Sequence, residues 1–126
     1  MKQPSLEQYL ELIREAPVYD VAQRTPLQLA AGLSRRLSNR VLLKREDLQQ
    51  VFSFKLRGAY NCIQQLSDAE RSKGVVAASA GNHAQGVALA ARLLGARAII
   101  VMPDNAPEVK RKATTGYGAQ IVPCRA

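Results

Sequence analysis

With 126 residues, of which 47% are apolar and 22% charged, the chain has the composition of a folded domain, and this excludes intrinsic disorder. The best apolar stretch, residues 87–102, is interrupted by Arg92 and Arg97, so a membrane span of about 18 apolar residues is also excluded. Residues 1–15 mix charged and polar side chains and do not form a signal peptide, so we expect a cytoplasmic protein with Cys62 and Cys124 as free thiols.

The net charge of +8 leaves the kind of partner open. A basic surplus suits nucleic acid, an anionic membrane or an anionic small molecule. Aromatic residues make up only 5% of the chain and no nucleic-acid motif accompanies the charge, so we interpret it as solvated surface and expect neither nucleic acid nor membrane as a partner. One histidine and two distant cysteines do not make a zinc site, so no metal is expected.

In chain order, the first predicted element is a helix over residues 6–15, which carries apolar residues at helical spacing and Ser5 as its cap. A second helix is predicted over residues 27–37 and a short strand over residues 41–44. The next helix is predicted to start near Ser53, a residue type that favours the N-cap position.

From residue 67 onward the signals become regular. Residues 67–70 form a capping-box signature for a short helix. Apolar strands then alternate with helices that end at glycines, the strands being predicted at residues 75–78, 98–102 and 120–122 and the helices at residues 81–94 and 107–115. Continuously apolar strands joined by helices indicate an α/β fold with a parallel sheet covered on both faces. The chain stops directly after the last strand, so we expect these residues to be part of a larger fold.

Two short segments are candidates for chemistry. Residues 79–83 (SAGNH) lie where a buried strand turns into a helix, and the free N–H groups of a helix start bind carboxylates and phosphates. Lys55 lies in the first turn of another helix, where a partly buried amine becomes a better nucleophile. Each also has a purely structural interpretation, because such turns need small residues and most lysines are simply exposed.

Together, the motifs SFKLRGAY (53–60) and SAGNHAQGVA (79–88) resemble those of the threonine dehydratase family, in the tryptophan-synthase-β-like group of pyridoxal-phosphate enzymes. The tetrad KRED (44–47) and the segment QVF (50–52) are more similar to the biosynthetic branch. The resemblance implies a three-layer parallel-sheet fold of type II in truncated form. Residues 1–50 would belong to the larger catalytic domain and residues 51–126 to the smaller α/β domain.

The resemblance also implies roles for individual residues. Lys55 matches the lysine that binds pyridoxal 5′-phosphate covalently, Phe54 the residue beside the cofactor ring, and Asn82 the amide that contacts the 3′ oxygen of the cofactor. The loop that receives the substrate carboxylate is matched by Ser79, Ala80, Gly81, Asn82 and His83. Related serine racemases carry a serine where Ala80 stands, and alanine has no proton to transfer, so dehydration is favoured over racemisation.

The implied reaction converts L-threonine, and also L-serine, into a 2-oxo acid and ammonia, which for threonine is a step towards isoleucine. The loop that grips the cofactor phosphate and the partner of the pyridine nitrogen are not found in the sequence, so this chain alone is expected to be inactive. A homo-oligomer is expected for the full-length protein. The alternatives are a catabolic or serine-racemase-like dehydratase and a non-catalytic cofactor-binding chain.

Overall fold

The strands after Gly74, β3 (Val75–Ala78), β4 (Ala98–Pro103) and β5 (Gln120–Cys124), form a parallel sheet in the order β3-β4-β5, joined by helices as the sequence predicts. The computed structural model describes residues 3–126. Two short 3-10 turns lie at Val18–Asp20 and Glu46–Leu48. The helices and strands in chain order are α1 (Leu6–Glu15), β1 (Leu27–Leu29), α2 (Ala31–Arg36), β2 (Leu42–Lys44), α3 (Lys55–Gln64), α4 (Asp68–Lys73), β3 (Val75–Ala78), α5 (Asn82–Leu93), β4 (Ala98–Pro103), α6 (Glu108–Gly116) and β5 (Gln120–Cys124).

Helix α5 is at the centre of the core. Eight consecutive residues of this helix, 84–91, are buried, because α3 packs along it and the sheet lies beneath it. The small side chains of its alanines and the absence of a side chain at Gly86 let neighbouring elements pack closely around the helix on several sides. The apolar stripe of α3 meets it with Leu56, Ala59, Tyr60 and Ile63. This contact joins the two segments that carry the sequence motifs.

Helices cover one face of the sheet within residues 3–126. Register pairs place alternate residues on each face, and the core face carries Val75, Ala77, Ala98, Ile100, Met102 and Ile121. The opposite face carries Val76, Ala78, Ile99, Val101 and Val122, of which Val76 is 70% exposed. Right-handed crossovers that step in the same direction across the sheet put α5 and α6 on the same side of it. Within residues 3–126, helices therefore cover one face of the sheet, whereas the sequence predicted helices on both faces.

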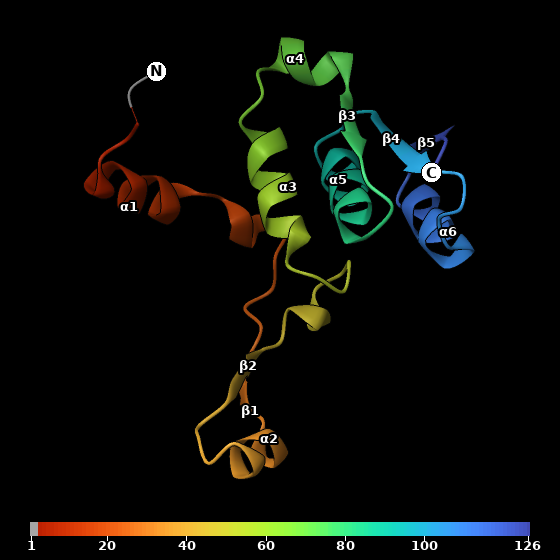
Figure 1. The fold of residues 1–126 in the computed structure, drawn as a ribbon. Helices are drawn as coiled ribbons and strands as arrows, with labels where there is room; N and C mark the ends of the chain where they lie inside the picture. The colour runs from red at the N-terminus through yellow and green to blue at the C-terminus, as the bar shows by residue number, and fades with distance from the viewer. Residues whose placement is uncertain (1–2) are drawn as a thin grey trace.

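Within the first fifty residues, helix α1 and the β1–β2 pair extend from this body as two arms (Figure 1). Helix α1 forms as predicted, with Ser5 and Gln8 making a capping box, but none of its residues is buried. The other arm is an antiparallel pair, β1 with β2, that carries α2 at its tip. The prediction of one helix over residues 27–37 is wrong, because residues 27–29 pair with residues 42–44 as a strand and leave only residues 31–36 helical.

The ends of the remaining helices follow local signals closely. Ser67 and Glu70 make the predicted capping box of α4. Gly95 stops α5 with a φ of 68°, which favours glycine. Ser53 is not the N-cap of α3, since Phe54 occupies that position; the Ser53 hydroxyl still accepts a hydrogen bond from the Lys55 N–H at 3.3 Å.

The state of the cysteines and the character of the helices also bear on the predictions made from the sequence. Cys62 and Cys124 are both free thiols, as predicted. Among residues 3–126, no helix has the length and apolar character needed to cross a bilayer.

Gly86 generates a stability prediction. A Cβ at this position would lie 3.1 Å from the carbonyl carbon and oxygen of Lys55 and 3.2 Å from the Leu56 nitrogen, and backbone atoms cannot move aside as a flexible side chain can. Gly86→Ala should therefore lower the free energy of unfolding by roughly 1–3 kcal/mol, measured by urea denaturation. Gly116→Ala is the matched control, because nothing lies within 4 Å of its Cβ position. Equal stability of the two variants would contradict the close approach of α5 to α3.

Candidate functional site

The first turn of α3 lies against the second turn of α5, at Gly86. Because Gly86 contacts the Lys55 backbone, and Asn82 lies one helical turn before Gly86 on the same face of α5, the two predicted site segments are neighbours. Residues 55 and 82 are thus brought close in space across a wide separation in the chain. The structure assembles the motifs into one region at the N-terminal ends of both helices.

Lys55 presents a free amine. Its side chain is exposed, and its Nζ lies 5.2 Å from the centre of the Phe54 ring, which is itself 59% exposed. Among residues 3–126, no carboxylate lies within ion-pair distance of this amine. The unpaired amine of Lys55 can react with a carbonyl compound. The exposed ring of Phe54 can stack against a flat ring.

The turn between β3 and α5 has the geometry of an anion site. Helix α5 begins at Asn82 with Gly81 as its N-cap and no side-chain cap bond, so its first N–H groups are available to a ligand. Ser79 accepts a hydrogen bond from the Gly81 N–H at 3.2 Å, and residues 79–81 are half-buried. The arrangement can hold a carboxylate against the helix start.

His83, in the first turn of α5, also borders a groove. It lines an apolar groove of about 340 Å³ between α3, β3 and α5, together with Gly58, Ala59, Cys62, Ile63, Leu66, residues 75–77 and Val87. The structure therefore places its side chain beside apolar groups of the groove. Its backbone still belongs to the first turn of α5.

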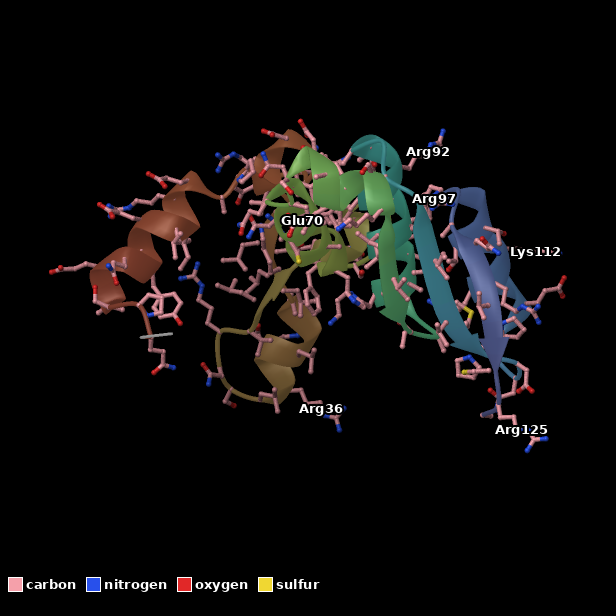
Figure 2. The ribbon with its side chains drawn as sticks, turned by 90° about the horizontal axis from the view of Figure 1, so that it is seen from above. Arg36, Glu70, Arg92, Arg97, Lys112 and Arg125 are labelled. Atoms are coloured by element: carbon pink, nitrogen blue, oxygen red, sulfur yellow. The ribbon has the colours of Figure 1, made fainter. Side chains whose placement is uncertain are left out.

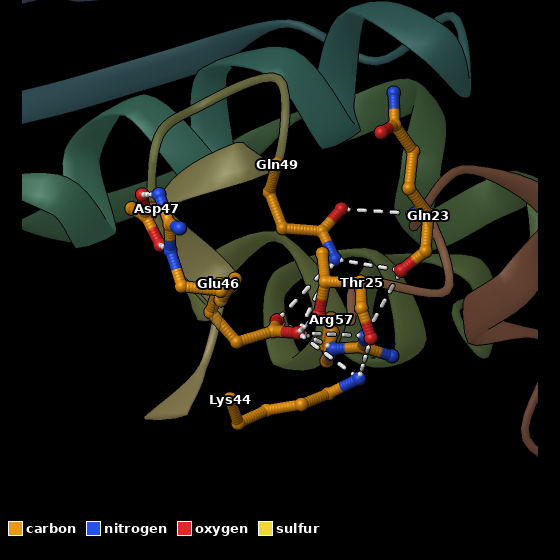
Figure 3. Close-up of polar contacts among 8 residues, drawn as sticks. Gln23, Thr25, Lys44, Glu46, Asp47, Gln49 and Arg57 are labelled. Atoms are coloured by element: carbon orange, nitrogen blue, oxygen red, sulfur yellow. Dashed lines mark hydrogen bonds and ion pairs between the residues drawn. The ribbon is translucent and has the colours of Figure 1, made fainter. Parts of the chain in front are cut away.

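A network of polar groups anchors α3 on its other side (Figure 3). Arg57, two residues after Lys55, donates from Nε to Glu46 at 2.8 Å and from Nη2 to the Gln23 carbonyl oxygen at 3.1 Å. Thr25 donates its hydroxyl to Glu46 at 2.6 Å, and the buried Gln49 bonds both the N–H and the carbonyl of Gln23. The network ties two separate stretches of the chain, residues 23–25 and 46–49, to the helix that begins with Lys55.

The Arg57 guanidinium lowers the pKa of Glu46 from its ordinary value of 4.5 to about 2. Partial burial of the carboxylate opposes this effect, while hydrogen bonds from Thr25 and Gln49 support it. In return, Glu46 raises the pKa of Arg57. The pair stays ionised under all ordinary conditions.

The segment before Lys55 is held in an unusual conformation. Phe52 has a φ of 54°, a left-handed value that costs a bulky residue of order 1–3 kcal/mol. Full burial of Val51 and a 2.8 Å hydrogen bond from the Tyr117 hydroxyl to the Gln50 carbonyl hold the segment in place. This loop fixes the direction from which the chain enters α3.

Three residues at the site were not singled out by sequence reasoning as contributors to it. Glu46 lies in the KRED tetrad and Arg57 in the lysine motif, whereas Lys110 lies outside all of these motifs. Lys110 donates to the Asn82 Oδ1 at 2.9 Å. These contacts join residues far apart in the chain, so no local spacing signals them. No cluster of side chains suited to hold a metal ion occurs among residues 3–126.

Comparison with known proteins identifies the family. Residues 18–126 match the family described as pyridoxal-phosphate dependent enzyme. The chain belongs to this family. It is α/β, of the type II fold that the resemblance implied, as the solved relatives below also show.

Individual relatives are similar over nearly the whole chain. The biosynthetic L-threonine dehydratase of Pasteurella multocida is 56% identical over 119 residues, which is 94% of this chain and 23% of that protein. The chloroplastic biosynthetic threonine dehydratase of Arabidopsis thaliana is 56% identical over 91% of this chain and 19% of its own length. The chain thus spans about a quarter or less of these relatives.

Solved structures agree with the sequence matches. The processed form of threonine deaminase isoform 2 from Solanum lycopersicum superposes with a TM-score of 0.89 and 54% identity, over 95% of this chain and 35% of that structure. Maize serine racemase superposes with a TM-score of 0.87 and 41% identity, over 92% and 36% of the two chains. A threonine deaminase and a serine racemase therefore share the fold of this chain.

The Glu46–Arg57 pair generates a prediction about pH. Because the pKa of Glu46 is lowered on folding, the pair stabilises the protein fully above about pH 4.5, and this contribution is lost as the pH falls towards about 2. Glu46→Gln should lower the free energy of unfolding at neutral pH by roughly 1.5–3 kcal/mol and flatten its decline in acid. Urea denaturation at several pH values measures both effects.

Glu11→Gln, the same change on the exposed helix α1, is the control and should preserve the acid dependence. An unchanged acid dependence in Glu46→Gln would contradict the assignment of the ion pair as a stabilising contact.

Proposed function

We propose that this chain supplies the lysine-bearing part of a pyridoxal-phosphate-dependent threonine dehydratase of the biosynthetic type. The observation that carries the proposal is the free Lys55 amine beside Phe54, next to the uncapped start of α5. The names of the relatives support L-threonine as substrate, with L-serine as a second. The product from threonine would be 2-oxobutanoate, with release of ammonia.

The side chains suit the cofactor chemically. Lys55 would hold pyridoxal 5′-phosphate through its amine, with Phe54 beside the ring and the Asn82 amide donating to the 3′ oxygen. When bound, the cofactor supplies an electron sink that stabilises negative charge at the substrate Cα. Lys55 Nζ would take the Cα proton, since the same amine is released when substrate binds.

The turn at residues 79–83 would bind and orient the substrate. The N–H groups at the start of α5, with Ser79, Ala80, Gly81, Asn82 and His83 as the surrounding loop, would receive the substrate carboxylate. A fixed carboxylate aligns the Cα–H bond with Lys55. Ala80 has no proton to give to the opposite face, which favours elimination of the β-hydroxyl over racemisation.

We also propose that residues outside this chain complete the site. The exposed apolar sheet face with Val76 and Val122, and the wholly exposed helix α1, support this proposal. The match to the Pasteurella multocida dehydratase, which covers only 23% of the length of that protein, also supports it. In this view residues 1–50 belong to a larger domain, residues 51–126 to a smaller one, and the whole protein is a homo-oligomer.

We propose the cytoplasm as the compartment of this protein, by analogy with its bacterial relatives. The names of the plant and yeast relatives place those proteins in chloroplasts and mitochondria.

A chimera tests the proposal. The matched segment of the Pasteurella multocida dehydratase is replaced by this chain, and 2-oxobutanoate formation from L-threonine is measured. Lys55→Ala should abolish the visible absorption of bound cofactor and reduce turnover by at least about a hundredfold. Lys73→Ala, the same change at an exposed position at the end of α4, should change neither. An active Lys55→Ala chimera would refute the assignment, and turnover by the 126-residue chain alone would refute the proposal that outside residues complete the site.

The likeness to maize serine racemase makes racemisation the second candidate activity. The chimera should form less D-serine from L-serine than its Ala80→Ser variant does, because only the serine hydroxyl can exchange a proton on the face opposite Lys55. Chiral chromatography of the products measures the difference. Equal D-serine formation by the two proteins would show that residue 80 does not separate the two activities.

A further inference from the structure

A cationic side chain from the neighbouring helix contacts the Asn82 side chain. The Lys110 ammonium on α6 donates to the Asn82 Oδ1 at 2.9 Å, across 28 positions of sequence. Lys110 is half-buried, whereas Asn82 is exposed at the first position of α5. The contact therefore lies directly at the proposed cofactor site.

Packing of α6 against α5 directs Lys110 towards this site. Thr114, one turn further along α6, is fully buried and donates its hydroxyl to the Lys110 carbonyl oxygen at 2.9 Å. Residues four apart share one face of a helix, so Lys110 lies on the buried side. Glu108 and Lys112 pair with each other at 2.7 Å and are more than three-quarters exposed, and Lys112 points outward (Figure 2).

The chemistry of the contact determines which end of the Asn82 amide faces a ligand. An ammonium group has three donors and no acceptor, so it can bind only the oxygen of the amide. With Oδ1 engaged, the NH2 group is the end left to bind a ligand, and it can only donate. An asparagine without such a partner can present either end, because the amide is nearly symmetric in shape.

We propose that Lys110 is a positioning residue that holds the Asn82 amide with its NH2 group towards the negatively charged 3′ oxygen of the cofactor ring. This inference rests on the proposed function, since Asn82 is the residue expected to contact that oxygen. Lys110 acts through Asn82 and does not itself touch the cofactor. Its positive charge also favours an anionic oxygen nearby.

The test uses the same chimera and measures two quantities, the apparent dissociation constant for pyridoxal 5′-phosphate by visible titration and the wavelength of the absorption band. Lys110→Met keeps the unbranched stem and removes the ammonium. It should weaken cofactor binding by about three- to tenfold, the value of one oriented hydrogen bond to a charged group, and shift the band. Lys110→Arg keeps a cationic donor and should restore most of the binding.

Two controls separate positioning from stability. Lys112→Met makes the same change on the outward side of α6 and should leave both quantities unchanged. In an Asn82→Ala background, Lys110→Met should have no further effect, because the group through which it acts is absent. Melting temperatures of the Lys110→Met and Lys112→Met proteins should agree within a few degrees.

The outcomes are distinct. Equal cofactor binding in the Lys110→Met and Lys112→Met proteins, or an undiminished Lys110 effect in the Asn82→Ala background, would overturn the role of Lys110 and leave the proposed function standing. A parent chimera that folds but binds no cofactor would overturn both.

Discussion

The close approach of α5 to the first turn of α3 is the contact on which the site depends. At Gly86 the two helices meet backbone to backbone, because a side chain there would lie 3.1 Å from the Lys55 carbonyl. This contact sets the distance between the lysine and the start of α5. Apolar side chains such as Leu56 and Ala88 bury the rest of the interface, so packing of the core determines the spacing of the two motif segments.

The Glu46–Arg57 pair restrains the same turn from the other side. Thr25 and Gln49, which are both buried, donate hydrogen bonds to the Glu46 carboxylate and favour its ionised form. Lys55 is thus flanked by a rigid apolar contact and a rigid polar one, while its own amine stays exposed and unpaired. A reactive amine benefits from this combination, because the backbone is fixed but the side chain is free to bind and release a ligand.

The Lys110–Asn82 contact extends this view to α6. The α6 helix contributes no residue to either sequence motif, yet it packs on α5 and carries a cation to the first residue of that helix. In many catalytic sites, the residue that touches the ligand is oriented by a neighbouring residue. That neighbour is itself held in place by the fold. Under the proposal for Lys110, α6 would supply this support through its contact with Asn82.

Local signals in the sequence determined most of the secondary structure. The capping boxes at Ser5 and Ser67, the stop at Gly95 and the apolar strands after Gly74 all act over a few residues, and each element formed where the pattern indicated. The motifs around Lys55 and Asn82 likewise identified the family that the comparisons show. These features depend on neighbouring residues, and the sequence records such neighbours directly.

Tertiary structure decided the rest. Residues 27–29 are a strand because residues 42–44 pair with them, a partner that their own helical pattern does not reveal. Helices cover one sheet face within residues 3–126 because both crossovers step the same way, whereas apolar strands alone suggest cover on two faces. The contacts of Arg57 with Glu46 and of Lys110 with Asn82 exist because packing brings separate elements together, and no local periodicity encodes a contact of that range.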